Sequence, residues 1–190
     1  MIWLFAVSTV GVLALGRWSL GRVRIEYQRD ERLSRTTAAV VWSLYTLHLG
    51  LTVWAALEGW WPLPLPALVT TVLGAASMLV GTYVYAAGLV AFRSVERMSG
   101  MDTSELVRRG IHRWSRNPQN VGWALFLGGI AIVSRSGAAM VLVVLFLLMF
   151  RLYVPIEEAF LGRVFGKEYR SYRAETARYV GIPRQRAENE

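Results

Sequence analysis

Residues 121–156, VGWALFLGGIAIVSRSGAAMVLVVLFLLMFRLYVPI, contain two apolar runs that are separated only by Arg135 and Ser136. Runs of this kind are read as membrane-crossing helices, because a bilayer leaves exposed backbone groups without hydrogen-bond partners. A connection of two residues forces the helices to lie antiparallel, so that their far ends meet. We therefore expect Arg116-Asn117-Pro118 and Glu157-Glu158 to be neighbours at one membrane surface.

Three more apolar runs precede this hairpin, so the chain is expected to fold as an all-α, multi-pass membrane helix bundle. The five runs cover 1–16, 36–57, 67–92, 121–134 and 137–156. They predict a single membrane domain of about five transmembrane helices. Three spans occupy 1–92, and the C-terminal half, 93–190, holds the hairpin 121–156 and a polar tail, 157–190, with a helical pattern.

The basic residues indicate how the bundle is oriented. Of the 21 lysines and arginines, 20 lie in the linker after the first run, in 93–120, or from Arg151 onward. Because cytoplasmic loops carry an excess of lysine and arginine, five spans would place the N-terminus outside and the C-terminus in the cytoplasm. This distribution favours contact with membrane lipids over nucleic acid as the reason for the net charge of +8. The one lysine, Lys167, suggests a GC-rich bacterial genome and hence a bacterial cytoplasmic membrane.

Four local features carry smaller predictions. Asp102 followed by Glu105 resembles a capping box for a short helix that Gly110 would end. Pro155 is expected to kink its helix and to turn the two following glutamates back over the bundle. Glycines that recur every seven residues, at Gly74, Gly81 and Gly88, favour close helix packing. His48 lies in the middle of the second run, where it is either functional or bonded to a neighbouring helix. The absence of cysteine and the presence of only two histidines argue against a metal site.

The segment from Leu106 to Arg184 resembles the C-terminal half of the isoprenylcysteine carboxyl methyltransferase family and its phospholipid methyltransferase relatives. The family pattern is arginine-histidine-proline-x-tyrosine-x-glycine, a hydrophobic hairpin, paired glutamates, and then FG-x-x-Y-x-x-Y. The matching residues are Leu106, Val107, Gly110, Arg116, Asn117, Pro118, Gly122, Glu157, Glu158, Leu161, Phe165, Gly166, Tyr169, Tyr172 and Pro183.

The resemblance implies an enzyme that transfers methyl from S-adenosylmethionine to a lipophilic acceptor, such as the carboxylate of an isoprenylcysteine-like lipid. The implied cofactor contacts are Ser104, Glu105, Leu106, Val107, His112, Asn117, Pro118, Gln119, Asn120 and Glu157. It also implies catalytic roles for Arg116, Asn117 and Glu157. Substrate contacts are expected from Arg151, Tyr153 and Glu158.

Four positions depart from the family pattern. Asn117 stands in place of histidine, Asn120 in place of tyrosine, His112 where relatives often have tyrosine, and Tyr153 in place of the arginine expected to contact substrate. Two alternatives therefore stay open. One is a lipid or steroid reductase that uses a nicotinamide cofactor, because that family shares a similar C-terminal pattern. The other is a degenerate membrane scaffold without activity.

Overall fold

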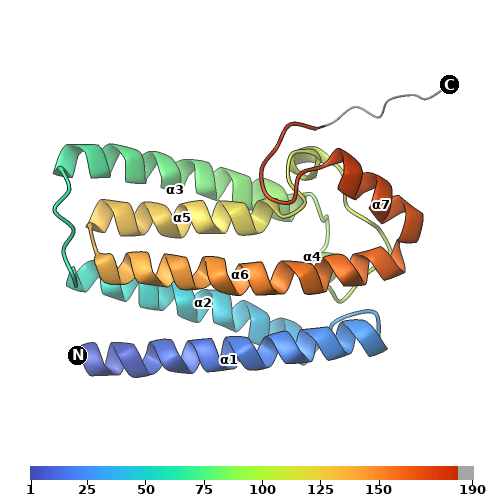
Figure 1. Cartoon of the computed structure of the whole chain (residues 1–190), viewed down its shortest axis with the longest axis horizontal. Coiled ribbons are helices and arrows are strands. Elements are labelled where there is room, and N and C mark those ends of the chain that lie inside the picture. The colour runs from blue at the N-terminus through green and yellow to red at the C-terminus, as the bar shows by residue number, and fades with distance from the viewer. Residues whose placement is uncertain (184–190) are drawn as a thin grey trace.

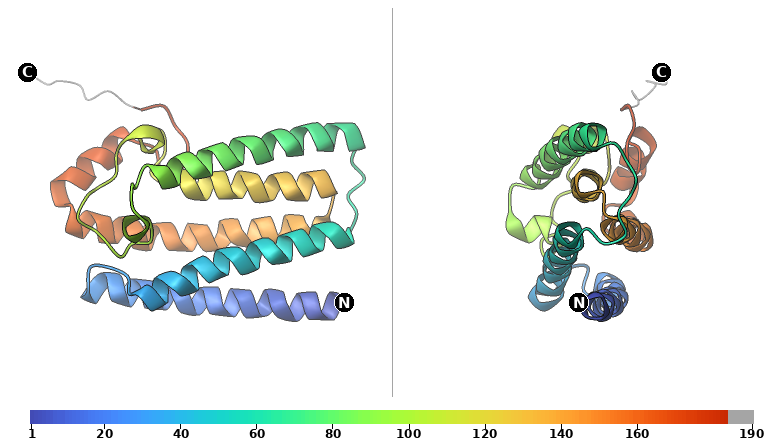
Figure 2. Two further views of the ribbon diagram at one scale, coloured as in Figure 1. Left: turned by 180° about the vertical axis from the view of Figure 1, so that it is seen from behind. Right: turned by 90° about the vertical axis from the view of Figure 1, so that its left-hand side faces the viewer.

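Five long helices run side by side in the computed structural model, which describes residues 1–183 (Figure 1). They are α1 (Ile2–Arg29), α2 (Arg35–Glu58), α3 (Ala67–Val90), α5 (Pro118–Ser134) and α6 (Gly137–Val164). Three short helices, α4 (Val95–Met98), η1 (Gly110–Arg113) and α7 (Gly166–Glu175), complete the described chain. The end-on view in Figure 2 places α5 in the middle of the bundle, with α3 at one edge and α1 at the opposite edge.

The all-helical architecture confirms the predicted fold class, since no strand forms within residues 1–183. Four helices, α1, α2, α3 and α6, are long and apolar enough to cross a membrane. With 17 residues, α5 is shorter and extends about 25 Å at 1.5 Å per residue. The count of five spans therefore stays a prediction. The part of the tail beyond residue 183 lies outside the described residues.

The hairpin forms as its two-residue connection predicts. Arg135 ends α5 in the left-handed conformation, and the hydroxyl of Ser136 accepts a hydrogen bond from the Ala139 amide to begin α6. The same hydroxyl donates to the carbonyls of Ala55 and Trp60, at 2.9 and 3.0 Å. These bonds fix the tip of the hairpin against the end of α2.

Two helices continue beyond the apolar runs that predicted them. Helix α1 extends through the arginine-rich stretch to Arg29, because arginine and glutamate are good helix formers. Glu26 anchors this extension by accepting hydrogen bonds from Ser34 and Thr37 at the start of α2. Helix α6 continues through Pro155 to Val164, so the expectation that the proline turns the glutamates back over the bundle was wrong. The chain turns only at Gly166, where φ is +50°.

The capping box predicted at Asp102 was also wrong. Residues 101–109 form no helix, because the two acidic side chains have other partners. The Asp102 carboxylate accepts a hydrogen bond from the Ser104 amide at 2.9 Å, which closes a local turn. Glu105 pairs instead with Arg97 and Arg109, at 2.7 and 2.6 Å. These ion pairs hold the loop across the end of the bundle where α1 and α6 finish, which we call the polar end.

Candidate active site

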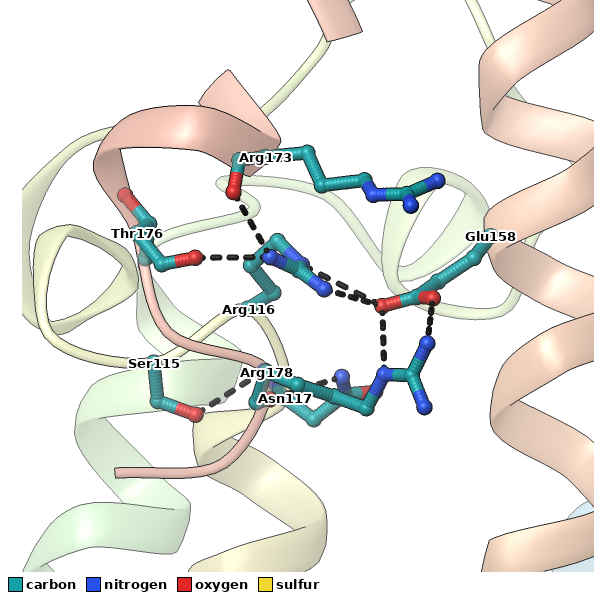
Figure 3. Close-up of polar contacts among 7 residues, drawn as sticks. All are labelled: Ser115, Arg116, Asn117, Glu158, Arg173, Thr176 and Arg178. Atoms are coloured by element: carbon teal, nitrogen blue, oxygen red, sulfur yellow. Dashed lines mark hydrogen bonds and ion pairs between the residues drawn. The ribbon is translucent and has the colours of Figure 1, made fainter. Parts of the chain in front are cut away.

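The hairpin brings two distant polar segments together at the polar end, as predicted. Arg116, just before α5, donates from Nε to Oε1 of Glu158 on α6 at 3.2 Å, and its Nη2 donates to the same oxygen (Figure 3). Both side chains are only 8% exposed. A charge pair this well buried needs good geometry and further hydrogen bonds to offset its lost hydration.

The C-terminal segment supplies those further bonds. Arg178 donates from Nη2 to Glu158 Oε2 at 2.6 Å, so that Glu158 lies between two guanidinium groups (Figure 3). Arg116 also donates to the carbonyls of Arg173 and Thr176, at 3.1 and 2.7 Å. We call Arg116, Glu158 and Arg178 the clamp. Its members hold the segment 173–178 against the N-terminus of α5.

Asn117 belongs to the same attachment. Its side-chain amide donates to the carbonyl of Arg178 at 3.1 Å, and its backbone amide donates to the hydroxyl of Ser115 at 3.0 Å. The residue is 2% exposed. Its amide group therefore binds the C-terminal segment and does not face open space.

A cavity of about 250 Å³ lies beside the clamp. At the polar end it is lined by charged and polar side chains, which include Arg97, Asp102, Glu105, Gln119 and Glu157. From there it continues between α1, α2 and α6, where aliphatic and aromatic side chains form the walls. We call this second part the apolar arm. The cavity can thus hold a molecule with a polar group at one end and a hydrocarbon tail at the other.

Glu157 is the carboxylate in this cavity that has no partner. Within residues 1–183 it takes part in no hydrogen bond or ion pair, whereas its neighbour Glu158 is held by two arginines. Tyr153, one turn earlier on α6, also lines the cavity, together with Tyr27 of α1 and Tyr45 of α2. A carboxylate among aromatic rings suits a cationic ligand, because both attract positive charge.

The start of α5 presents further polar groups to the cavity. Asn120 is 2% exposed, and its Oδ1 accepts a hydrogen bond from the Tyr45 hydroxyl, which fixes that ring. Gln119 also lines the cavity, and its buried Oε1 has no hydrogen-bond partner in the described chain. Native proteins rarely leave a buried acceptor unpaired, so this oxygen is a candidate ligand contact.

His112 lines the cavity from η1 but is held by its surroundings. Its Nε2 lies 3.2 Å from the carbonyl of Gly88, and its ring packs edge-on against Phe92. Burial lowers the pKa of the imidazole, and nearby Arg109 adds to that effect. The hydroxyl of Tyr172 donates to the His112 carbonyl at 2.7 Å and so connects α7 to this wall.

The structure brings together most of the residues that the sequence suggested for the site, but not all of them. Those that line the cavity are Glu105, Leu106, Val107, His112, Arg116, Gln119, Asn120, Tyr153 and Glu157. Those that do not line it are Ser104, Asn117, Pro118, Arg151 and Glu158. Ser104 and Arg151 are exposed, Glu158 is part of the clamp, and Asn117 and Pro118 are buried beside it. The assigned roles stay predictions. Within residues 1–183 no group of three metal-ligating side chains occurs.

Sequence reasoning missed most of the cavity residues that come from before Leu106, where the resemblance begins. Tyr27, Tyr45 and Arg97 line the cavity, but each lies in a segment that the resemblance does not cover. Trp42 attaches the loop to α2 by donating to the Ser99 hydroxyl at 3.0 Å. The one available signal was a tyrosine inside an apolar run, at Tyr45, which by itself does not indicate a ligand site.

Comparison with known families matches the region that supplies part of this site. Residues 69–168 match the family model described as phospholipid methyltransferase, which covers α3 to the start of α7. No curated protein and no solved structure matches the chain. The matched region includes Glu157, the clamp residues Arg116 and Glu158, and the start of α5.

Proposed function

Since the chain belongs to the phospholipid methyltransferase family, we propose that it transfers methyl from S-adenosylmethionine to a lipophilic acceptor at the polar end of the bundle. The family and the four apolar helices make it an integral membrane protein of a methyltransferase family that acts on lipid-like substrates.

The observation that carries the proposal is the unpaired Glu157 carboxylate at the junction of the polar end and the apolar arm. S-adenosylmethionine supplies an electrophilic methyl group and also carries an ammonium and a carboxylate. Glu157 would hold the ammonium through a charge-assisted hydrogen bond. The backbone amides of Gln119 and Asn120, in the first turn of α5, suit the carboxylate because a helix N-terminus favours anions.

Methyl transfer is an in-line displacement, so the chain contributes mainly by positioning the reactants. The acceptor would enter from the bilayer and place its tail in the apolar arm, with its reacting group beside Glu157. The tyrosines around Glu157 exclude water from the reacting groups, which strengthens electrostatic interactions there. The acceptor's lone pair would form a bond to the methyl carbon as the carbon–sulfur bond breaks. An amine acceptor would therefore enter in its neutral form, after releasing its proton to water.

Two acceptor classes remain, and the structure favours one of them. A carboxylate acceptor, as in isoprenylcysteine-like lipids, needs no general base. The two arginines that line the cavity are already neutralised, however, because Arg97 pairs with Asp102 and Glu105, and Arg116 pairs with Glu158. Tyr153 stands where the family's substrate arginine is expected. With no unpaired cation among the described lining residues to hold a lipid carboxylate, and with Glu157 assigned to the ammonium of the methyl donor, the cavity suits a neutral lipid amine better than a lipid carboxylate.

Calorimetric titration of the purified protein with S-adenosylhomocysteine tests the cofactor. Glu157→Gln removes one charge-assisted hydrogen bond and should weaken binding by about 10-fold or more. Glu168→Gln, at an exposed carboxylate on α7, is the matched control and should bind as the unaltered protein does. A thermal-shift comparison tests the two alternatives. A melting temperature raised by NADPH and not by S-adenosylhomocysteine would support the reductase. A melting temperature raised by neither would support the scaffold.

The orientation is also a proposal, with the N-terminus outside and the polar end in the cytoplasm. It is supported by the 20 basic residues expected on that side and by the solubility of the methyl donor in the cytoplasm. The chain has no cysteine, so single cysteines can be introduced without background labelling. Glu58→Cys should react with a membrane-impermeant maleimide in intact cells, and Arg113→Cys should not. The reverse pattern would contradict the orientation.

A further inference from the structure

His48 lies in the apolar arm, far from the polar end of the cavity. It belongs to α2, lines the cavity, and is only 9% exposed. Its ring packs against Phe146 of α6, with a centroid separation of 5.8 Å. A polar side chain in such surroundings is costly unless its hydrogen-bonding groups are paired.

One nitrogen of this ring is paired and the other is not. Nε2 lies 3.0 Å from the carbonyl oxygen of Leu142 on α6. Because a carbonyl only accepts, Nε2 carries the proton of this hydrogen bond. In the neutral ring Nδ1 then presents a lone pair, and it is buried without a partner in the described part of the chain. No described carboxylate pairs with His48 to favour a second proton.

The unpaired, buried Nδ1 does not have the surroundings that hold a water molecule. A buried water usually makes two to four hydrogen bonds, so it needs several polar groups around it. The side chains that line this part of the cavity include Leu51, Leu142 and Phe146. The nearby hydroxyl of Thr52 already donates to the His48 carbonyl at 2.8 Å. A hydroxyl carried into the arm by a ligand needs only the one acceptor.

The position of His48 relative to Glu157 indicates which part of a ligand reaches it. Leu142, the partner of His48, and Glu157 are both on α6, about 22 Å apart along the helix at 1.5 Å per residue. A molecule with its reacting group at Glu157 therefore reaches His48 only with the far part of its tail.

We infer that His48 Nδ1 accepts a hydrogen bond from a hydroxyl on the distal tail of the acceptor. The acceptor is then a lipid whose hydrocarbon chain is hydroxylated far from the group that receives the methyl. This inference rests on the proposed function for the direction in which the acceptor lies. His48 acts as a specificity-determining residue and takes no part in the methyl transfer.

The test uses long-chain alkylamines in which a single hydroxyl is moved stepwise along the chain, with the unsubstituted amine as reference. Dissociation constants are measured on the purified protein in nanodiscs. The unaltered protein should bind one distal-hydroxyl member about 5-fold more tightly than the reference, as one neutral hydrogen bond allows. A hydroxyl midway along the chain should give no gain, because it lies among apolar side chains such as Leu145, Met149 and Phe150.

Two substitutions separate recognition from packing. Gln places its amide at the position of Nε2, so His48→Gln keeps the bond to Leu142 and should lose the 5-fold preference. Asn places its amide near Nδ1, so His48→Asn should retain part of the preference although it loses the bond to Leu142. Equal binding of all amines by the unaltered protein, or an undiminished preference in His48→Gln, would overturn the inference.

Binding of S-adenosylhomocysteine in the same samples separates this inference from the proposed function. A distal-hydroxyl preference without S-adenosylhomocysteine binding would keep the His48 contact and reject the methyltransferase proposal. S-adenosylhomocysteine binding without the preference would keep the methyltransferase proposal and reject the His48 contact.

Discussion

Two contacts between apolar helices in this bundle differ: one is tightly closed, and the other leaves a cavity. Along the contact of α3 with α5, glycines face glycines, and a Cβ added at Gly81 would lie 2.5 Å from the Phe126 amide nitrogen and 2.7 Å from the Gly122 carbonyl oxygen. We call this contact the glycine seam. Between α1, α2 and α6, large side chains such as Phe146 and Tyr45 keep the helices apart and leave the cavity. Helices of similar hydropathy thus form either a sealed contact or a ligand site, depending on the size of the facing residues.

The largest expected effect comes from placing a bulky residue in the glycine seam. Gly81→Leu forces the backbones of α3 and α5 apart, because backbone atoms cannot move aside as a flexible side chain can. We expect a loss of more than about 4 kcal/mol, at the upper end for single substitutions. Denaturant unfolding in detergent measures this loss.

The control for this variant is on the partner helix. A Cβ at Gly128 of α5 would have no heavy atom within 4 Å, so Gly128→Ala should stay within about 1 kcal/mol of the unaltered protein. Similar losses in Gly81→Leu and Gly128→Ala would show that the seam is not the sealed contact described above.

The glycine seam could be predicted from sequence, whereas the cavity could not. The seven-residue spacing of Gly74, Gly81 and Gly88 predicted close packing on one face of one helix, and the structure confirms it. The two-residue turn at Arg135 and Ser136 predicted that the polar segments meet, and the pair of Arg116 with Glu158 confirms this too. Both predictions depend on local spacing or chain connectivity alone.

The remaining site residues depend on which helices pack together, which local patterns do not determine. Tyr27 and Tyr45 face the cavity only because α1 and α2 lie against α6. Asn117 matched the family pattern by position, yet its side chain binds the C-terminal segment. Asp102 and Glu105 had the spacing of a capping box but found an amide and two arginines as partners. In each case a tertiary contact replaced the local one.

The second-largest loss of stability is expected from breaking the clamp, which closes the polar end beside the cavity. Arg116→Met leaves Glu158 with one guanidinium and removes two hydrogen bonds to backbone carbonyls. Breaking a buried ion pair of this kind should cost about 3 kcal/mol. Arg178 is 43% exposed, so Arg178→Met should cost about 1 kcal/mol or less. Denaturant unfolding distinguishes the two, and equal losses would contradict the ranking.

A bulky residue on the cavity side should have a smaller effect on stability than one in the seam. The nearest heavy atom to a Cβ at Gly16 of α1 is the sulfur of Met149 at 3.3 Å, and that side chain is flexible. Gly16→Leu should therefore change the free energy of unfolding by no more than about 1.5 kcal/mol.

The same variant should separate acceptor binding from cofactor binding. Leucine at position 16 fills part of the apolar arm, so methylation of a lipid acceptor should fall about 10-fold, equivalent to about 1.4 kcal/mol. S-adenosylhomocysteine affinity should not change. Gly21→Leu, on the same helix but outside the cavity lining, is the control and should keep full activity. Unchanged activity in Gly16→Leu would show that the arm does not hold the acceptor.

The smallest effect is a pH dependence where the seam meets the cavity. His112 bonds to the carbonyl of Gly88, the glycine at the polar end of the seam, and burial lowers its pKa in the folded protein. The unfolded chain then binds a proton more readily than the folded one. Stability is therefore constant well above the ordinary histidine pKa of about 6.5 and falls as the pH decreases through it, by at most about 1.4 kcal/mol per pH unit. His112→Gln keeps a donor for Gly88 and removes the titration, so its unfolding free energy should depend less on pH than that of the unaltered protein. Identical pH profiles for the two proteins would mean that His112 is not held neutral at this junction.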